Sequence, residues 1–164
     1  ITTADLADGS LTTVKIADGV VTATKIADYS VASLKLAPSS VPFAYTSSTG
    51  VASTTSTTFV DMTDTSVTIN LARTSHLLII FTAEARVNPA GGVIYLQARV
   101  GTDLAVPDSN GYELIPPTNY NTYTFTFYKP SVTAGTYSVN IRWYVTMNTA
   151  YAYKRALTVL ALPA

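Results

Sequence analysis

The sequence predicts an all-β protein in which an antiparallel β-sandwich head follows an extended repeat stalk or arm. Three patterns in the chain lead to this prediction. Apolar residues recur at every fifth position near the N-terminus, apolar and polar residues alternate after residue 43, and clusters rich in Gly, Pro and Asn separate the alternating runs. A period of two is that of a half-buried strand, and no stretch has the period of a long amphipathic helix.

The N-terminal segment repeats a ten-residue unit, with an apolar residue at every fifth position. The unit is Leu-Ala-Asp-Gly at residues 6–9 and Ile-Ala-Asp-Gly at residues 16–19. A strip with one medium-sized apolar side chain per five residues has no interior of its own, so it buries these side chains only against copies of itself. The spacing is too regular for a disordered low-complexity tail. The apolar positions are Ile1, Leu6, Leu11, Ile16, Val21, Ile26, Val31 and Leu36.

Two arrangements of this segment remain open at the level of sequence. In the first, three chains form a stalk, the simplest closed arrangement in which identical apolar stripes meet on an axis. In the second, the segment is an arm that docks against the exposed sheet edge of a neighbouring subunit and lengthens a filament. Both arrangements make the eight apolar positions assembly contacts.

The local conformation of each unit is partly predicted. Asp8-Gly9 and Asp18-Gly19 are turn signals, because Gly accepts positive φ and Asp bonds the local backbone. Residues 12–17 and their equivalents form either a short strand or a single helical turn capped by Thr and Gly. Pro38 and Pro42 prevent a continued ladder or helix, so we place the domain boundary after residue 38. The stalk or arm is then 1–38 and the head is 39–164.

The head shows the alternation of an antiparallel sandwich. Turn clusters lie at residues 88–92, 107–111, 116–119 and 134–135, at the spacing typical of such folds. The residues expected to face inward are Val67, Ile69, Leu71, Leu77, Ile79, Phe81, Ala83, Ala85, Val87, Ile94, Leu96, Ala98, Val100, Tyr123, Phe125, Phe127, Tyr137, Val139, Ile141, Trp143, Val145 and Met147.

Two of the expected strands are apolar on both faces. They are residues 77–81 and 157–162, which would place Leu78, Ile80, Leu160 and Leu162 on an outer face without charge. A symmetric subunit interface uses such a face as its core, whereas a monomer needs its own loops to cover it. We therefore expect these four residues to lie at an assembly interface, with intramolecular cover as the alternative.

The strand order resembles that of a known family of trimeric heads. The residues that carry the resemblance are 43–45, 65–69, Gly135 to Trp143 and Arg155 to Pro163. They resemble the jelly-roll head shared by tumour necrosis factor and the globular heads of complement and collagen-like proteins, including those at the tips of bacterial spore hairs. The repeat is similar to the Lys-Ile-Ala-Asp-Gly arrays of phage tail fibres and bacterial surface fibres. The resemblance implies a jelly-roll homotrimer on a trimeric stalk, although this stalk lacks the Gly-x-y period of collagen.

Composition excludes several classes of partner. Charged residues make up 12% of the chain, and ten basic side chains balance ten acidic ones, so we expect no nucleic-acid partner and no anionic membrane surface. The longest apolar run is too short for a membrane span. Few Lys and Glu, abundant Thr, Ser and Tyr, and no Cys favour an extracellular location, on a cell-surface appendage or a virion. The sequence leaves open what precedes Ile1.

Catalytic chemistry has little support, so we expect a protein that is not an enzyme and has neither cofactor nor metal. His76 is the single histidine, and nothing near it in sequence forms a nucleophile or an oxyanion hole. Glu84 and Glu113 are the only glutamates and are far apart in sequence. Calcium is a weak alternative at two pairs of aspartates, which lack the spacing of a calcium loop. These pairs are Asp61 with Asp64 and Asp103 with Asp108.

Tyrosines gather in the second half of the chain. Exposed tyrosines are rigid and amphipathic, and they stack on sugars or anchor protein partners. Tyr112 and Tyr120 lie in or near loops, so they are the candidates for a ligand site. The expected function is that of a structural subunit of an extracellular fibre, filament or appendage. The alternative is the tip of a phage tail fibre or adhesin that binds a cell-surface glycan or receptor.

Overall fold

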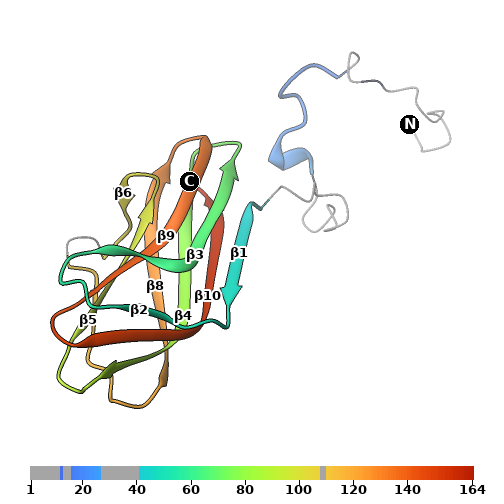
Figure 1. Ribbon diagram of the computed structural model, residues 1–164. Helices are drawn as coiled ribbons and strands as arrows, with labels where there is room; N and C mark the ends of the chain where they lie inside the picture. Colours follow the sequence, from blue (N-terminus) through green and yellow to red (C-terminus); the bar gives the residue numbers. More distant parts are fainter. Residues whose placement is uncertain (1–11, 13–15, 27–40, 108–109) are drawn as a thin grey trace. The chain divides into compact units, whose positions relative to one another are not determined.

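The computed structural model describes residues 12, 16–26, 41–107 and 110–164 (Figure 1). The chain divides into two units, Ile1–Ser40 and Val41–Ala164. Each unit is described by itself below.

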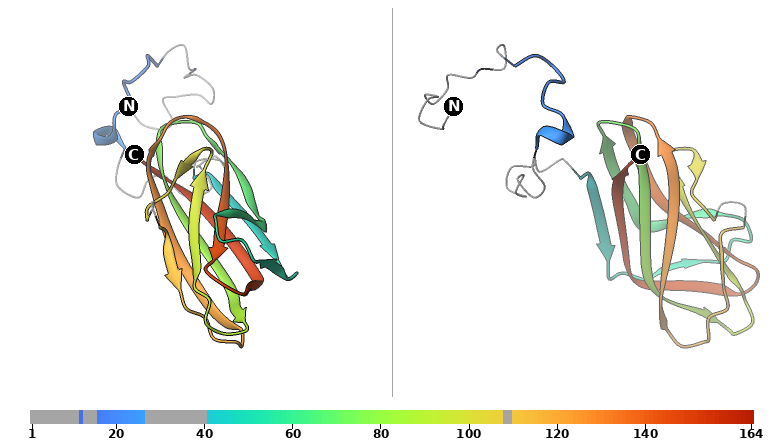
Figure 2. Two further views of the ribbon diagram at one scale, coloured as in Figure 1. Left: turned by 60° about the vertical axis from the view of Figure 1, so that its left-hand side comes forward. Right: turned by 180° about the vertical axis from the view of Figure 1, so that it is seen from behind.

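The second unit is a sandwich of two antiparallel five-stranded sheets (Figure 1). In what we call the β10–β4 sheet, the order is β1 (Phe43–Ser48), β10 (Thr149–Pro163), β4 (Ser75–Asn88) and β8 (Asn121–Val132), and β2 (Ala52–Thr54) also pairs with β10. In the β9–β5 sheet, the order is β3 (Val60–Leu71), β9 (Gly135–Val145), β5 (Ile94–Val100) and β6 (Asp103–Leu104), and β7 (Tyr112–Leu114) also pairs with β5. Figure 2 gives two further views of these layers.

This arrangement confirms the expected all-β sandwich head and is that of a jelly roll. The first strand of the unit lies beside the last, and strands that are neighbours in a sheet are mostly distant in sequence. The expected repeat stalk lies largely outside the described residues.

The core lies between the two sheets, where the predicted alternation places it. Along β4, every second residue from Leu77 to Val87 is buried, and Trp143 of β9 is among the largest fully buried side chains. Met147 was expected to face the core, but it is exposed, because β9 ends at Val145 and the methionine lies in the following turn.

A β-bulge in β10 reverses which residues of that strand face the core. Tyr153 pairs with Glu84 and Ala156 pairs with Thr82, so β10 has one residue more than β4 in this interval. Before the bulge the even-numbered residues of β10 are buried, and after it the odd-numbered ones are. Lys154 takes a φ of 45° in the bulge.

Arg155 fills the inner side of this bulge and ties the first strands to the rest of the head. Its side chain is buried. Nη1 donates to the carbonyl oxygens of Gly50 and Ala152, each at 2.7 Å. Nη2 donates to Ser48 Oγ and to Asp64 Oδ2, each at 3.3 Å. Burial lowers the pKa of Arg155, and the charge of Asp64 opposes this shift.

In the first unit, the described residues of the repeat form a turn and a short helical segment. Val20 N donates to the carbonyl of Ala17 at 3.3 Å, and Gly19 has a φ of 77°, which confirms the turn expected at Asp18-Gly19. A single 3₁₀ turn follows at Ala23–Lys25. The ten-residue repeat that contains Ala23–Lys25 therefore forms the helical turn, one of the two expected alternatives, and not a short strand.

Candidate functional site

The outer face of the β10–β4 sheet carries a continuous patch of apolar and aromatic side chains. Strand register brings these residues together from four strands, because cross-strand partners project from the same face. Phe43, Leu160, Leu78 and Tyr128 form one row across β1, β10, β4 and β8. Tyr45, Thr158, Ile80 and Thr126 form the next row. The name apolar patch is used below for Phe43, Tyr45, Leu78, Ile80, Tyr128, Leu160 and Leu162.

The structure brings all four outer-face residues of the sequence analysis into this patch. Leu78, Ile80 and Leu160 are partly exposed, and Leu162 is 41% exposed. The sequence analysis did not name Phe43 and Tyr45 as part of this face, and they are 59% and 55% exposed. The signal that marks them is their period-two spacing in a strand at the edge of the sheet. Such exposure shows that loops in the described part of the head leave the patch open to solvent.

The single histidine lies at one end of the apolar patch. His76 pairs with Leu162 in the sheet, and its ring lies 5.6 Å from the ring of Tyr128, centroid to centroid. Its Nδ1 accepts a hydrogen bond from the backbone N–H of Ser131 at 3.1 Å. These contacts are those of a histidine that holds the entry of a strand.

Tyr112 and Tyr120 lie in different environments. Tyr112 donates its hydroxyl to the carbonyl of Thr126 at 2.7 Å and packs edge-on against Phe127, so it covers the side of the core. Tyr120 lies on the outer face of the β10–β4 sheet, in contact with the guanidinium of Arg86. The two residues therefore do not form one site, and Tyr112 packs against the core.

The residues around Tyr120 form a second cluster on the same face. Arg86 lies between the rings of Tyr120 and Tyr151, and Tyr153 contacts Tyr120 with 6.0 Å between ring centroids. We call Arg86, Tyr120, Tyr151 and Tyr153 the tyrosine–arginine cluster. Lys154 Nζ lies 2.9 Å from Glu84 Oε1, which raises the pKa of Lys154 through the hydrogen bond and the charge of the carboxylate. The sequence analysis identified Tyr120 as a candidate but not Arg86, because only strand register brings Arg86 between Tyr120 and Tyr151.

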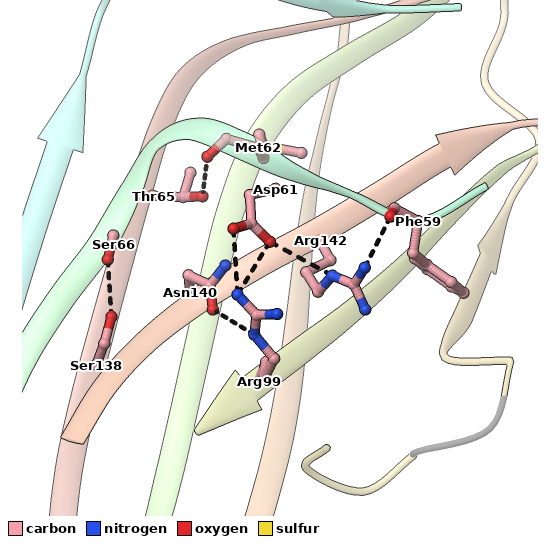
Figure 3. Close-up of polar contacts among 9 residues, drawn as sticks. All are labelled: Phe59, Asp61, Met62, Thr65, Ser66, Arg99, Ser138, Asn140 and Arg142. Carbon is pink, nitrogen blue, oxygen red and sulfur yellow. Dashed lines mark hydrogen bonds and ion pairs between the residues drawn. The ribbon is translucent and has the colours of Figure 1, made fainter. Parts of the chain in front are cut away.

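The outer face of the β9–β5 sheet carries a network of charged side chains (Figure 3). Asp61 lies between two arginines, with its Oδ2 3.1 Å from Arg99 Nη2 and its Oδ1 3.4 Å from Arg142 Nε. Arg99 Nε also donates to Asn140 Oδ1 at 3.3 Å, and Arg142 Nη2 donates to the carbonyl of Phe59 at 2.7 Å. The network joins β3, β9 and β5 across the sheet.

The described aspartates among those considered as calcium ligands form salt bridges with cationic side chains. Asp61 pairs with two arginines as described, Asp64 pairs with Arg155, and Asp103 lies 3.5 Å from Lys129 Nζ. Asp108 lies outside the described residues. Within the described ranges, no group of three or more His, Asp or Glu side chains is placed to hold a metal ion.

The two glutamates are on different sheets. Glu84 lies on β4 and bonds Lys154, whereas Glu113 lies on β7 and accepts a hydrogen bond from the hydroxyl of Tyr95 at 3.3 Å. This separation gives no pair of carboxylates facing one another across a cleft.

The assembly positions of the repeat are described in part. Ile16, Val21 and Ile26 are exposed in the single chain. The other positions lie outside the described residues, and these are Ile1, Leu6, Leu11, Val31 and Leu36. In the described part of the chain, no helix combines the length and the hydropathy that a membrane span requires.

Comparisons with known proteins do not assign a family. No family model matches the chain, and no curated protein matches it. A solved structure entitled "CBM4 structure and function" is similar to this chain with a TM-score of 0.33 and 17% sequence identity, over 63% of this chain and 69% of that one. The fold assignment above rests on the strand order.

Proposed function

We propose that the head associates into a homotrimer through the apolar patch and that the protein is a non-enzymatic structural subunit of an extracellular fibre, filament or appendage. The observation that carries the proposal is the apolar patch on the outer face of the β10–β4 sheet, where strand register gathers seven large apolar or aromatic side chains. Exposed patches of this kind mark interaction sites in soluble proteins.

The energy of such an interface is of the order that association requires. Burying a large apolar side chain completely contributes about 1.5–3 kcal/mol, so covering the four that are roughly half exposed contributes about 1 kcal/mol each, and the less exposed Leu78, Ile80 and Leu160 contribute less. The resulting ~5 kcal/mol per copy is at the low end of the cost of association, which is about 4–15 kcal/mol. The patch therefore needs support from a second contact, and the exposed apolar positions of the repeat provide one.

We propose three chains per assembly because of the repeat and of the resemblance to trimeric heads. A stripe with one apolar residue in five meets identical stripes most simply around a three-fold axis. The jelly-roll heads that this one resembles are trimers on stalks. The absence of Cys and the low content of charged residues suit a protein that works outside a cell or on a virion.

Light scattering of the full chain tests this proposal. We expect a mass of about 52 kDa, three times the 17.4 kDa of one chain. The double variant Phe43→Glu, Leu162→Glu places charges on two side chains that are exposed in one head, so the fold should tolerate them. Its expected mass is that of a monomer. Ile115→Glu is the matched control, because Ile115 is 70% exposed and lies outside the patch, and this variant should remain a trimer.

A chain that begins at Ser39 measures the contribution of the repeat. Because the patch alone is near the limit for association, the trimer of this shortened chain should dissociate at a higher protein concentration than the trimer of the full chain. A monomeric full chain at millimolar concentration contradicts the proposal. So does a double variant with the wild-type mass.

A further inference from the structure

Arg86 is held between two aromatic rings by the register of the β10–β4 sheet. Tyr151 of β10 is the direct cross-strand partner of Arg86. On the other side, Ala85 pairs with Asn121, which places Tyr120 opposite Arg86. The guanidinium carbon lies 4.7 Å from the centroid of each tyrosine ring. Both faces of the guanidinium are therefore covered, and only its N–H edge is available to a partner.

The N–H groups of this guanidinium have no acceptor among the residues that the structure describes. Its Nε is buried and makes no hydrogen bond. By contrast, Arg99 and Arg142 pair with Asp61, and Arg155 pairs with Asp64. Partly buried arginines elsewhere in the head thus have a carboxylate, whereas Arg86 lacks one.

A preorganised guanidinium fork is complementary to a carboxylate. The planar fork makes two parallel hydrogen bonds to such a group, and these bonds are about twice as strong as neutral ones. Fixing the side chain in advance lowers the conformational entropy that binding costs. The nearby Lys154 is already paired with Glu84, so the cluster has a net charge of one positive unit and favours an anion.

The tyrosines indicate what else the ligand carries. The hydroxyls of Tyr120, Tyr151 and Tyr153 make no hydrogen bond to another described residue. Tyr120 and Tyr151 flank the guanidinium, and Tyr153 packs beside Tyr120. The three residues supply rings that pack on C–H faces and hydroxyls that both donate and accept. A sugar ring bearing hydroxyls and one carboxylate matches all three features.

We propose that the tyrosine–arginine cluster binds the carboxylate of an acidic saccharide, such as a uronic acid unit of a surface polysaccharide. The site is separate from the apolar patch, because Arg86 lies six residues from Ile80, the nearest member of the patch on β4, which is about 20 Å. A head that has assembled through the patch leaves this end of the sheet for a ligand. The inference assigns recognition to the cluster, whereas the proposed function concerns assembly alone.

Calorimetric titration of the full chain with a galacturonic acid tetrasaccharide tests the site. Its methyl-esterified form has the same sugar rings but no charge, so we expect it to bind at least tenfold more weakly. Arg86→Gln should also weaken binding of the acid form at least tenfold, and Arg86→Lys should weaken it less. Arg73→Gln, in an exposed arginine of the β3–β4 loop, is the matched control and should bind as the wild type does.

Two further measurements separate the possible outcomes. Light scattering of Arg86→Gln should give the wild-type mass, so a loss of binding is not a loss of assembly. Tyr120→Leu removes one wall of the cluster without changing charge and should weaken binding as well. The proposal is overturned if the acid form does not bind, if the ester binds equally, or if Arg86→Gln retains affinity. It is also overturned if a tetra-aspartate peptide binds as tightly, since the site then recognises acidic peptides.

Discussion

Replacement of Arg155 by alanine should destabilise the head more than any surface substitution. The guanidinium is buried and donates four hydrogen bonds, of which one stays within β10 and three join β10 to the end of β1, to the loop after β1 and to β3. Arg155→Ala removes all four donors at once. The backbone oxygen of Ala152 then loses a charged donor at a buried site, and that of Gly50 loses one at a partly buried site.

The size of the loss in stability depends on how much hydration each acceptor regains when the arginine is removed. Breaking a buried ion pair by removal of one partner costs about 3–5 kcal/mol. Here the lower end applies, because the side chain of Asp64 is 56% exposed and recovers its hydration when the arginine is gone. We expect a loss of about 3 kcal/mol in the free energy of unfolding. For a domain of this size, that loss lowers Tm by about 12 °C.

Denaturant unfolding followed by fluorescence measures this loss, since Trp143 is the only tryptophan and lies in the core. All variants are compared at one protein concentration, because self-association raises apparent stability. Asp64→Asn is the control and should cost less than about 1 kcal/mol, as for other exposed ion pairs. If Arg155→Ala costs less than about 1 kcal/mol, or no more than Asp64→Asn, the hydrogen bonds of Arg155 do not hold the strands together.

Three other predictions concern packing, backbone and titration. Gly111→Ala should destabilise the head by more than about 1 kcal/mol in chemical unfolding, because φ is 66° and the new Cβ would overlap the carbonyl oxygen of Leu96. An unchanged midpoint would show that this loop shifts freely. Trp143→Ala should cost about 3–5 kcal/mol, measured by circular dichroism, since the ring is 2% exposed; a loss below 1 kcal/mol would contradict the described core. Burial and the charge of Glu113 raise the pKa of Tyr95 above 10.0, so its contribution to stability is present below pH 10 and falls as pH rises, when the unfolded chain ionises first. Ultraviolet titration should show a lower pKa for Tyr95 in Glu113→Gln, and an unchanged pKa would rule out that charge as a cause.

Strand register explains why the sequence predicted part of the candidate site. Leu78 and Leu160 were identified because each lies in a run that is apolar on both faces, which is visible within one segment. Phe43 and Tyr128 were not assigned to this face because their neighbours in the patch are distant in sequence. Arg86 was missed for the same reason, since no local pattern shows that two tyrosines flank it.

The bulge in β10 is a second feature that sequence patterns do not determine. Buried and more exposed residues alternate along β10 from Thr149 to Leu162 except at the bulge, where Lys154 is the extra residue. This stretch contains no Gly or Pro that would mark the position of the bulge. The insertion turns Arg155 toward the core. A charged residue would be expected to face solvent, and it is buried only because four acceptors from three segments meet there.

The sequence by itself determined the class of fold, the alternating core strands and the outer faces without charge, because each depends on periodicity within one segment. Only the tertiary structure decided which strands are neighbours, so it alone decided the extent of the apolar patch and the position of Arg86 between Tyr120 and Tyr151. The physical reason is that hydrophobic burial acts on any face that is apolar, whereas register depends on long-range backbone pairing. Pairing of this kind leaves no trace in the spacing of residues along one strand.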